Sequence, residues 1–102
     1  MSVHRKKGER PESDFFATPP AVVKVGVDFA SSVVSNPPAR ILEPGSAAAA
    51  PFLRGAAIRW PDATTFGVEY LPRTEPAHPN VIFDTDFMVW GAATSEKWDL
   101  II

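Results

Sequence analysis

The sequence predicts an α/β domain built around a mostly parallel sheet of about four strands. Segments with a helical spacing of apolar residues alternate along the chain with short runs rich in β-branched and aromatic residues. Strands that are separated by crossover segments pair in parallel, with right-handed connections. In addition, the first apolar run ends in Glu43, and a turn of small residues follows it. Ligands of open α/β sheets bind at the carboxyl ends of the strands, which is where this turn would lie.

The composition fits one small globular domain. The chain has 102 residues, of which 45% are hydrophobic. Its net charge of −2 argues against binding of nucleic acid through bulk electrostatics. The absence of cysteine excludes disulfides and thiolate metal sites, and we expect no metal. No apolar run approaches the ~18 residues of a membrane span and no signal peptide is visible, so we expect a cytoplasmic, soluble protein without a membrane partner.

The amino-terminal segment is polar and basic. We expect residues 1–13 to form a flexible, solvated arm, and the alternative is a basic arm that contacts DNA phosphates. Thr18 is a candidate N-cap, and Pro19 suits the first turn of a helix over residues 19–35. Asn36-Pro37-Pro38 would end this helix.

The first predicted helix carries two neighbouring apolar stripes. They are Val22, Val25, Phe29 and Val33, and Val23, Val27, Ala30 and Val34. Because valine lowers helix propensity, we expect a mostly buried helix that packing stabilises.

The later segments predict strands, one more helix and a long loop. Where folds of this kind often have another helix, this chain has a run rich in proline. The expected elements are a strand over residues 39–43, a helix over about 50–59, a strand over 64–69, the proline-rich loop over 71–80, a strand over 80–84, and a strand that begins at 98. Phe52, Leu53, Ala56 and Ala57 are available for the buried face of the second helix.

Three acids fall at or near the ends of successive predicted strands. A carboxylate at Glu43 could hold an ammonium or sulfonium group, and Glu69 lies where an acid typically accepts both ribose hydroxyls. Asp86 could accept the amine of an adenine, with Phe87 as an apolar face. The alternative for each acid is a cap or a solvated side chain, and for Phe87 a core position. The order of the acids, beside a loop of small residues, favours a nucleoside pocket.

Five short motifs carry a family resemblance. They are Phe16-Ala17-Thr18-Pro19, Ile41-Leu42-Glu43-Pro44-Gly45 with Pro51-Phe52-Leu53-Arg54, Phe66-Gly67-Val68-Glu69, Asp86-Phe87-Met88-Val89-Trp90, and Trp98-Asp99-Leu100-Ile101-Ile102. In these motifs, residues 14–102 resemble the amino-terminal part of adenine-N6 DNA methyltransferases, the family of TaqI-like and Eco57I-type modification methylases. The resemblance implies a partial class I, Rossmann-like methyltransferase fold. It also implies a complete enzyme that transfers a methyl group from S-adenosyl-L-methionine to an extruded adenine of DNA.

The resemblance also implies roles for individual residues. Thr18 would contact the methionine carboxylate of the cofactor, and Glu43 would lie by its amino end. Glu69 would bind the ribose and Asp86 the adenine amine. The other residues of the implied pocket are Pro44, Gly45, Ser46 and Ala47 in the cofactor loop, and Tyr70 and Phe87 beside the adenine ring.

The sequence departs from the family pattern at several places. The family's catalytic Asn-Pro-Pro-aromatic motif is absent, so we expect this portion alone to be inactive and assign no catalytic residue. The one Asn-Pro-Pro, at residues 36–38, is followed by Ala39 and is interpreted as a helix stop. The loop over residues 45–51 is one residue longer than related loops and lacks their second glycine, and Leu71 replaces an acid.

Two alternatives follow from these departures. One is a non-catalytic remnant or interaction module that keeps the fold without the cofactor. The other is a different nucleotide-binding α/β domain, such as a dinucleotide enzyme, against which the missing G-x-G-x-x-G argues.

Overall fold

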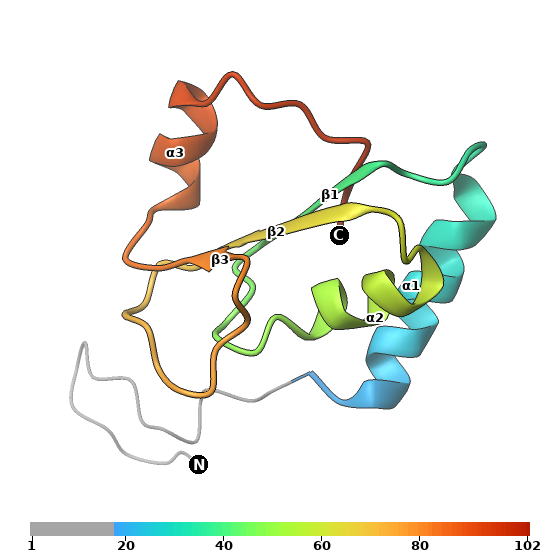
Figure 1. Cartoon of the computed structure of the whole chain (residues 1–102), viewed down its shortest axis with the longest axis horizontal. Helices are drawn as coiled ribbons and strands as arrows, with labels where there is room; N and C mark the ends of the chain where they lie inside the picture. The colour runs from blue at the N-terminus through green and yellow to red at the C-terminus, as the bar shows by residue number, and fades with distance from the viewer. Residues whose placement is uncertain (1–17) are drawn as a thin grey trace, which may run out of the picture.

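The computed structural model describes residues 18–102. The predicted arm over residues 1–13 and the Phe16-Ala17 part of the first motif lie outside these described residues. In chain order the elements are α1 (Pro20–Val33), β1 (Arg40–Pro44), α2 (Pro51–Arg59), β2 (Thr64–Val68), β3 (Val81–Ile82), α3 (Phe87–Ala93) and β4 (Leu100–Ile101). They alternate between helix and strand along most of the chain (Figure 1).

The four strands form one parallel sheet in the order β3-β2-β1-β4. The register places Leu42 of β1 between Phe66 of β2 and Ile101 of β4. Strand β1 is therefore central, and the chain leaves it toward β2 on one side before β4 joins it on the other. This arrangement confirms the predicted α/β class with a parallel sheet of four strands and is compatible with a Rossmann-like fold.

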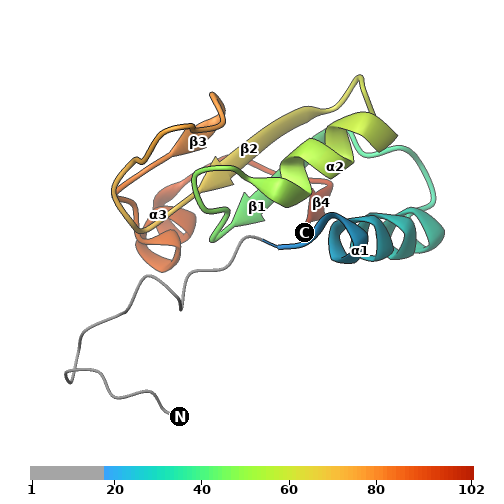
Figure 2. The ribbon, with the colours of Figure 1, turned by 90° about the horizontal axis from the view of Figure 1, so that it is seen from below.

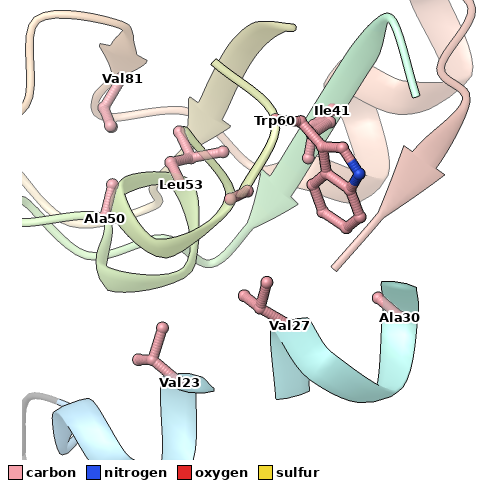
Figure 3. Packing of buried hydrophobic residues seen from close by; sticks show 9 residues of the cluster. Val23, Val27, Ala30, Ile41, Ala50, Leu53, Trp60 and Val81 are labelled. Atoms are coloured by element: carbon pink, nitrogen blue, oxygen red, sulfur yellow. The ribbon is translucent and has the colours of Figure 1, made fainter. Parts of the chain in front are cut away.

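Helices α1 and α2 pack against each other on one face of the sheet, and α3 lies on the opposite side (Figures 1 and 2). The main core lies between the sheet and α2, and α1, which packs against α2, also contributes side chains to it. Figure 3 shows Ile41 of β1 and Leu53 of α2 in this cluster, with Val23 and Val27 pointing into it from α1. Ile41 and Leu53 are each 0% exposed, and the burial of each of these side chains contributes about 1.5–3 kcal/mol to stability.

The opposite face of the sheet carries an aromatic cluster. Because side chains alternate along a strand, Leu42 and Phe66 point away from α2. The Phe66 ring stacks on Trp90 of α3 and on Trp98, with 5.9 Å between ring centroids in both pairs. Arg40 lies over Trp98, 4.6 Å from the ring centroid. This cluster positions α3 and the segment that leads into β4.

The prediction that α1 is mostly buried was wrong. Val23, Val27 and Ala30 are buried, whereas the stripe of Val22, Val25, Phe29 and Val33 is between 51% and 69% exposed. The reason is that α1 packs on one side only, against α2. At the closest point, a Cβ added to Gly55 of α2 would come within 2.5 Å of Val23 Cγ1. Ala57 of α2, which was available for the buried face in the sequence prediction, is also exposed.

The start of α1 also differs from the prediction. The N-cap is Pro19 rather than Thr18, and it makes no side-chain cap bond. Its carbonyl accepts hydrogen bonds from the N–H groups of Val22 and Val23 at 3.0 and 3.1 Å. Because Pro20 follows, Pro19 is restricted to extended backbone and adopts ψ 147°, so the helix begins one residue later than predicted.

The sequence prediction missed α3. Asp86 caps this helix by accepting a hydrogen bond from the Met88 N–H at 2.9 Å. The sequence did contain a signal for this helix. An Asp, a typical N-cap, is followed by Phe87 and Trp90, which lie three positions apart and contact each other. By contrast, the predicted absence of a helix from the proline-rich loop over residues 71–80 is confirmed.

Candidate functional site

A cavity of about 730 Å³ opens at the carboxyl ends of β1 and β2. Ligand pockets are typically about 300–1,000 Å³ in volume, so a nucleoside cofactor would fit. Its position beside β1, where the chain turns from one side of the sheet to the other, is the usual ligand site of open parallel sheets. The lining residues are Thr18, Glu43–Ala49, Pro51, Phe52, Glu69–Leu71, Thr74–Pro76 and Ile102.

Glu43 lies at the base of this cavity and is only 4% exposed. Its Oε1 accepts a hydrogen bond from the Leu53 N–H in the first turn of α2, at 3.0 Å. Helix α2 has Ala50 as its N-cap, which offers no side-chain acceptor. The Glu43 carboxylate therefore satisfies a free N–H of the helix, and its charge opposes the positive end of the helix dipole.

Burial raises the pKa of the Glu43 carboxyl from 4.5 to about 7, although the N–H groups of Leu53 and Phe52 favour the charged form. Desolvation penalises the carboxylate more than these backbone donors stabilise it. At neutral pH Glu43 is therefore close to its titration midpoint.

The loop over residues 45–50 follows β1 and forms the floor of the cavity. Gly45 has φ 64° and Ala47 and Ala50 have φ 61° and 48°, all in the left-handed region. Alanine is disfavoured there by roughly 1–2 kcal/mol per residue. The loop thus adopts glycine-like backbone geometry at two alanines.

Several contacts hold this strained loop in place. The N–H groups of Gly45 and Ser46 donate to the Val68 carbonyl at 2.7 and 3.2 Å. Ser46 is 1% exposed and packs over Gly67, where an added Cβ would lie 2.8 Å from Ser46 Oγ. The His78 N–H donates to the Ala48 carbonyl at 2.7 Å. The absence of a side chain at Gly67 is therefore what lets the loop close onto β2.

Glu69 directly follows β2, and its carboxylate makes hydrogen bonds to two loops. Its Oε1 accepts from the Ala47 N–H at 2.7 Å, and its Oε2 accepts from the Leu71 N–H at 2.8 Å. The side chain is 8% exposed and lines the cavity. Because each carboxylate oxygen has two acceptor positions, Glu69 keeps capacity for further donors such as hydroxyl groups.

The structure brings most of the predicted pocket residues together around this cavity. Thr18 lines one end, and Tyr70, which is 70% exposed, lines another part of the wall. Asp86 and Phe87 do not line the cavity. Asp86 caps α3, and the Phe87 ring lies against Trp90 with 6.2 Å between centroids.

The wall also includes residues that the sequence prediction did not assign to the site. Thr74, Glu75 and Pro76 come from the proline-rich loop, and Ile102 follows β4. Glu75 is paired with Arg73, whose Nε lies 2.5 Å from Glu75 Oε2. No motif surrounds these residues, and only the path of the loop across the end of the sheet brings them to the cavity.

Asn36-Pro37-Pro38 lies in the segment between α1 and β1, before the first strand rather than after it. These residues line a separate pocket with Trp60 and none of them lines the cavity at the carboxyl ends. Helix α1 ends at Val33, two residues earlier than predicted, so the motif lies beyond the helix end, which is compatible with its interpretation as a helix stop.

Residues 18–102 hold no group of three His, Cys, Asp or Glu side chains arranged to bind a metal ion. None of the helices in this range combines the length and apolar character that crossing a membrane requires. Comparison of the chain with family models, curated proteins and solved structures found no match.

Proposed function

We propose that this chain is the S-adenosyl-L-methionine-binding portion of a site-specific DNA adenine-N6 methyltransferase. When bound, the cofactor would supply the methyl group for transfer to an extruded adenine. The observation that carries the proposal is the cavity at the carboxyl ends of β1 and β2, where Glu43, Glu69 and the small-residue loop meet. The DNA partner and the adenine specificity rest on the family resemblance of the motifs.

The residues of the cavity fit this cofactor chemically. S-adenosyl-L-methionine carries a sulfonium, an ammonium, a carboxylate and a ribose diol. Glu43 and Glu69 are acceptors for the positive groups and the hydroxyls. Gly45, Ser46 and Ala47 are small and line the cavity, so they leave room for the ligand beside the two acids.

The second candidate is a module that keeps the fold without the cofactor, and specific hydrogen bonds favour it. Both oxygens of Glu69 and one oxygen of Glu43 already accept backbone N–H groups. These acids thus stabilise the loop and α2 whether or not a ligand is present. Asp86, the implied adenine partner, caps α3 instead of lining the cavity.

Calorimetric titration with S-adenosyl-L-methionine tests the proposal. Binding should also raise the thermal midpoint, because ligand at 100 times its Kd stabilises a protein by about 2.7 kcal/mol. The Glu69→Ala variant should lose this binding. Glu96→Ala serves as the matched control, because Glu96 is an exposed acid outside the cavity that pairs with Arg40.

The outcomes separate the two candidates. Absence of both heat and thermal shift at millimolar ligand, with a folded protein, would contradict the proposal and favour the module. Full binding by Glu69→Ala would show that the ribose role of Glu69 is wrong.

A further inference from the structure

The wall of the cavity contains an acid to which neither a sequence motif nor the family resemblance gives a role. Glu75 of the proline-rich loop lines the cavity, and its side chain is 69% exposed, so a ligand can reach the carboxylate. Asp86, the acid that the resemblance places at the adenine amine, does not line the cavity. In this structure the adenine therefore needs a different hydrogen-bond acceptor.

The loop that carries Glu75 is anchored beside the end of β3. Arg73 Nε lies 2.5 Å from Glu75 Oε2, and the Arg73 guanidinium carbon lies 5.7 Å from the centroid of the Phe83 ring. Phe83 directly follows β3, and β3 pairs with β2, which Glu69 directly follows. Because neighbouring strands lie about 4.8 Å apart, these contacts hold Glu75 at the β3 side of the cavity, next to the β2 side that carries Glu69.

The acids of the cavity follow the order of the groups in the cofactor. Strand β2 lies between β1 and β3, so Glu43, Glu69 and Glu75 come one after another along the edge of the sheet. The amino acid, the ribose and the adenine come one after another in S-adenosyl-L-methionine. With the amino end at Glu43 and the ribose at Glu69, the base lies at the β3 side, where Glu75 is.

Two groups on this side of the cavity suit an adenine ring. Tyr70, whose side chain is 70% exposed, lines the wall next to Glu69 and offers the ring an aromatic face. Arg73 Nε donates to Oε2 of Glu75, and no donor among residues 18–102 reaches Oε1. An ionised carboxylate only accepts hydrogen bonds, so it suits the exocyclic amine of adenine and opposes the carbonyl oxygen that hypoxanthine carries at the same ring position.

We propose that Glu75, rather than Asp86, recognises the adenine of the cofactor by accepting a hydrogen bond from its exocyclic amine. This inference rests on the proposed function, and it adds the residue that sets the base specificity of the cavity. The proline-rich loop is then part of the binding site, although it has no regular structure.

Calorimetric titrations of the full chain with S-adenosylhomocysteine and with its deaminated counterpart, S-inosylhomocysteine, test the inference. These ligands differ only in the base, where a carbonyl replaces the amine. The adenine form should bind about fivefold more tightly, which is the effect of one net hydrogen bond. In Glu75→Gln the ratio should fall toward one, because an amide can accept from an amine or donate to a carbonyl.

Asp86→Asn makes the same change of charge at the other acid. Asparagine caps a helix as well as aspartate does, so α3 should keep its first turn and the ratio should stay at the wild-type value. Glu75 is exposed, and within residues 18–102 its side chain pairs with Arg73 alone, so Glu75→Gln is expected to fold. Circular dichroism compares both variants with the wild type.

Each outcome bears on the inference. Equal affinities for the two ligands in the wild-type protein, or a fivefold ratio that persists in Glu75→Gln, would overturn it and leave the proposed function standing. A ratio that falls in Asp86→Asn would also overturn it, because Asp86 would then bind the adenine. Absence of binding by both ligands would overturn the proposed function together with the inference.

Discussion

The raised pKa of Glu43 makes stability depend on pH in a direction that can be worked out in advance. Below pH 4.5 the carboxyl is protonated in the folded and the unfolded chain, and its burial carries no charge penalty. Between pH 4.5 and about 7 the unfolded chain ionises first, so the folded chain binds more protons and stability falls as the pH rises. Above pH 7 both forms are ionised and the penalty is constant.

The size of this effect follows from the two pKa values. A shift from 4.5 to about 7, at about 1.36 kcal/mol per pKa unit, amounts to roughly 3 kcal/mol. The Glu43→Gln substitution removes the charge and keeps the acceptor for the Leu53 N–H. The raised pKa already includes the effect of the backbone hydrogen bonds on the carboxylate, so they are not subtracted again. At pH 8 the variant should therefore be more stable than the wild type by about 3 kcal/mol.

Urea unfolding of both proteins at pH 4.5, 6 and 8 measures this difference. Subtracting the wild-type from the variant free energy of unfolding cancels the titration of the other groups, and the difference should grow with pH. A variant that is less stable than the wild type at pH 8, or a difference that does not change with pH, would refute the argument. The carboxylate would then be stabilised more by the α2 backbone than it is penalised by burial.

Three further substitutions test the loop and α3, with urea unfolding as the measurement unless another is named. Gly67→Ala places a Cβ 2.8 Å from Ser46 Oγ and should cost about 1–3 kcal/mol, and an unchanged midpoint would contradict the close packing. Ala47→Gly relieves the strain of a residue at φ 61°. It should be about 1–2 kcal/mol more stable than the matched variant Ala49→Gly, because residue 49 does not have a positive φ. Equal stabilities of the two variants would argue against strain at Ala47. Asp86→Ala removes the cap bond and should cost about 1 kcal/mol, seen as faster hydrogen exchange of the α3 amides, whereas Asp86→Asn should change little.

The sheet was predictable from the sequence because its signals are local. Each strand is a short apolar or β-branched run, and the proline-rich and small-residue segments between them mark the connections. The burial of α1 was not predictable in the same way. Both of its stripes are apolar, and the close approaches of Val23 to Gly55 and of Gly26 to Phe52 determine which stripe faces α2.

The candidate site likewise contains residues that could be predicted from local signals and residues that could not. Glu43, Glu69 and the loop between β1 and α2 could be assigned to the carboxyl edge because strand ends are readable from the sequence. Thr74 and Glu75 could not, because their place in the wall depends on the path of a loop without regular structure. The position of Asp86 outside the cavity likewise depends on α3, whose cap it forms.

The bonds of Glu69 limit how a ribose can bind to it. A diol that displaced the N–H groups of Ala47 and Leu71 would leave two donors without partners, at roughly 1–3 kcal/mol each where they are buried. Recognition is therefore favourable only if the hydroxyls use the remaining acceptor positions of the carboxylate, with both backbone bonds kept. Hydrogen exchange of these two amides in the presence of S-adenosyl-L-methionine tests this: they should become more protected on binding. Faster exchange at Ala47 or Leu71 in the complex would mean that the ligand opens the loop, and that the 2.7 and 2.8 Å bonds belong to the empty form alone.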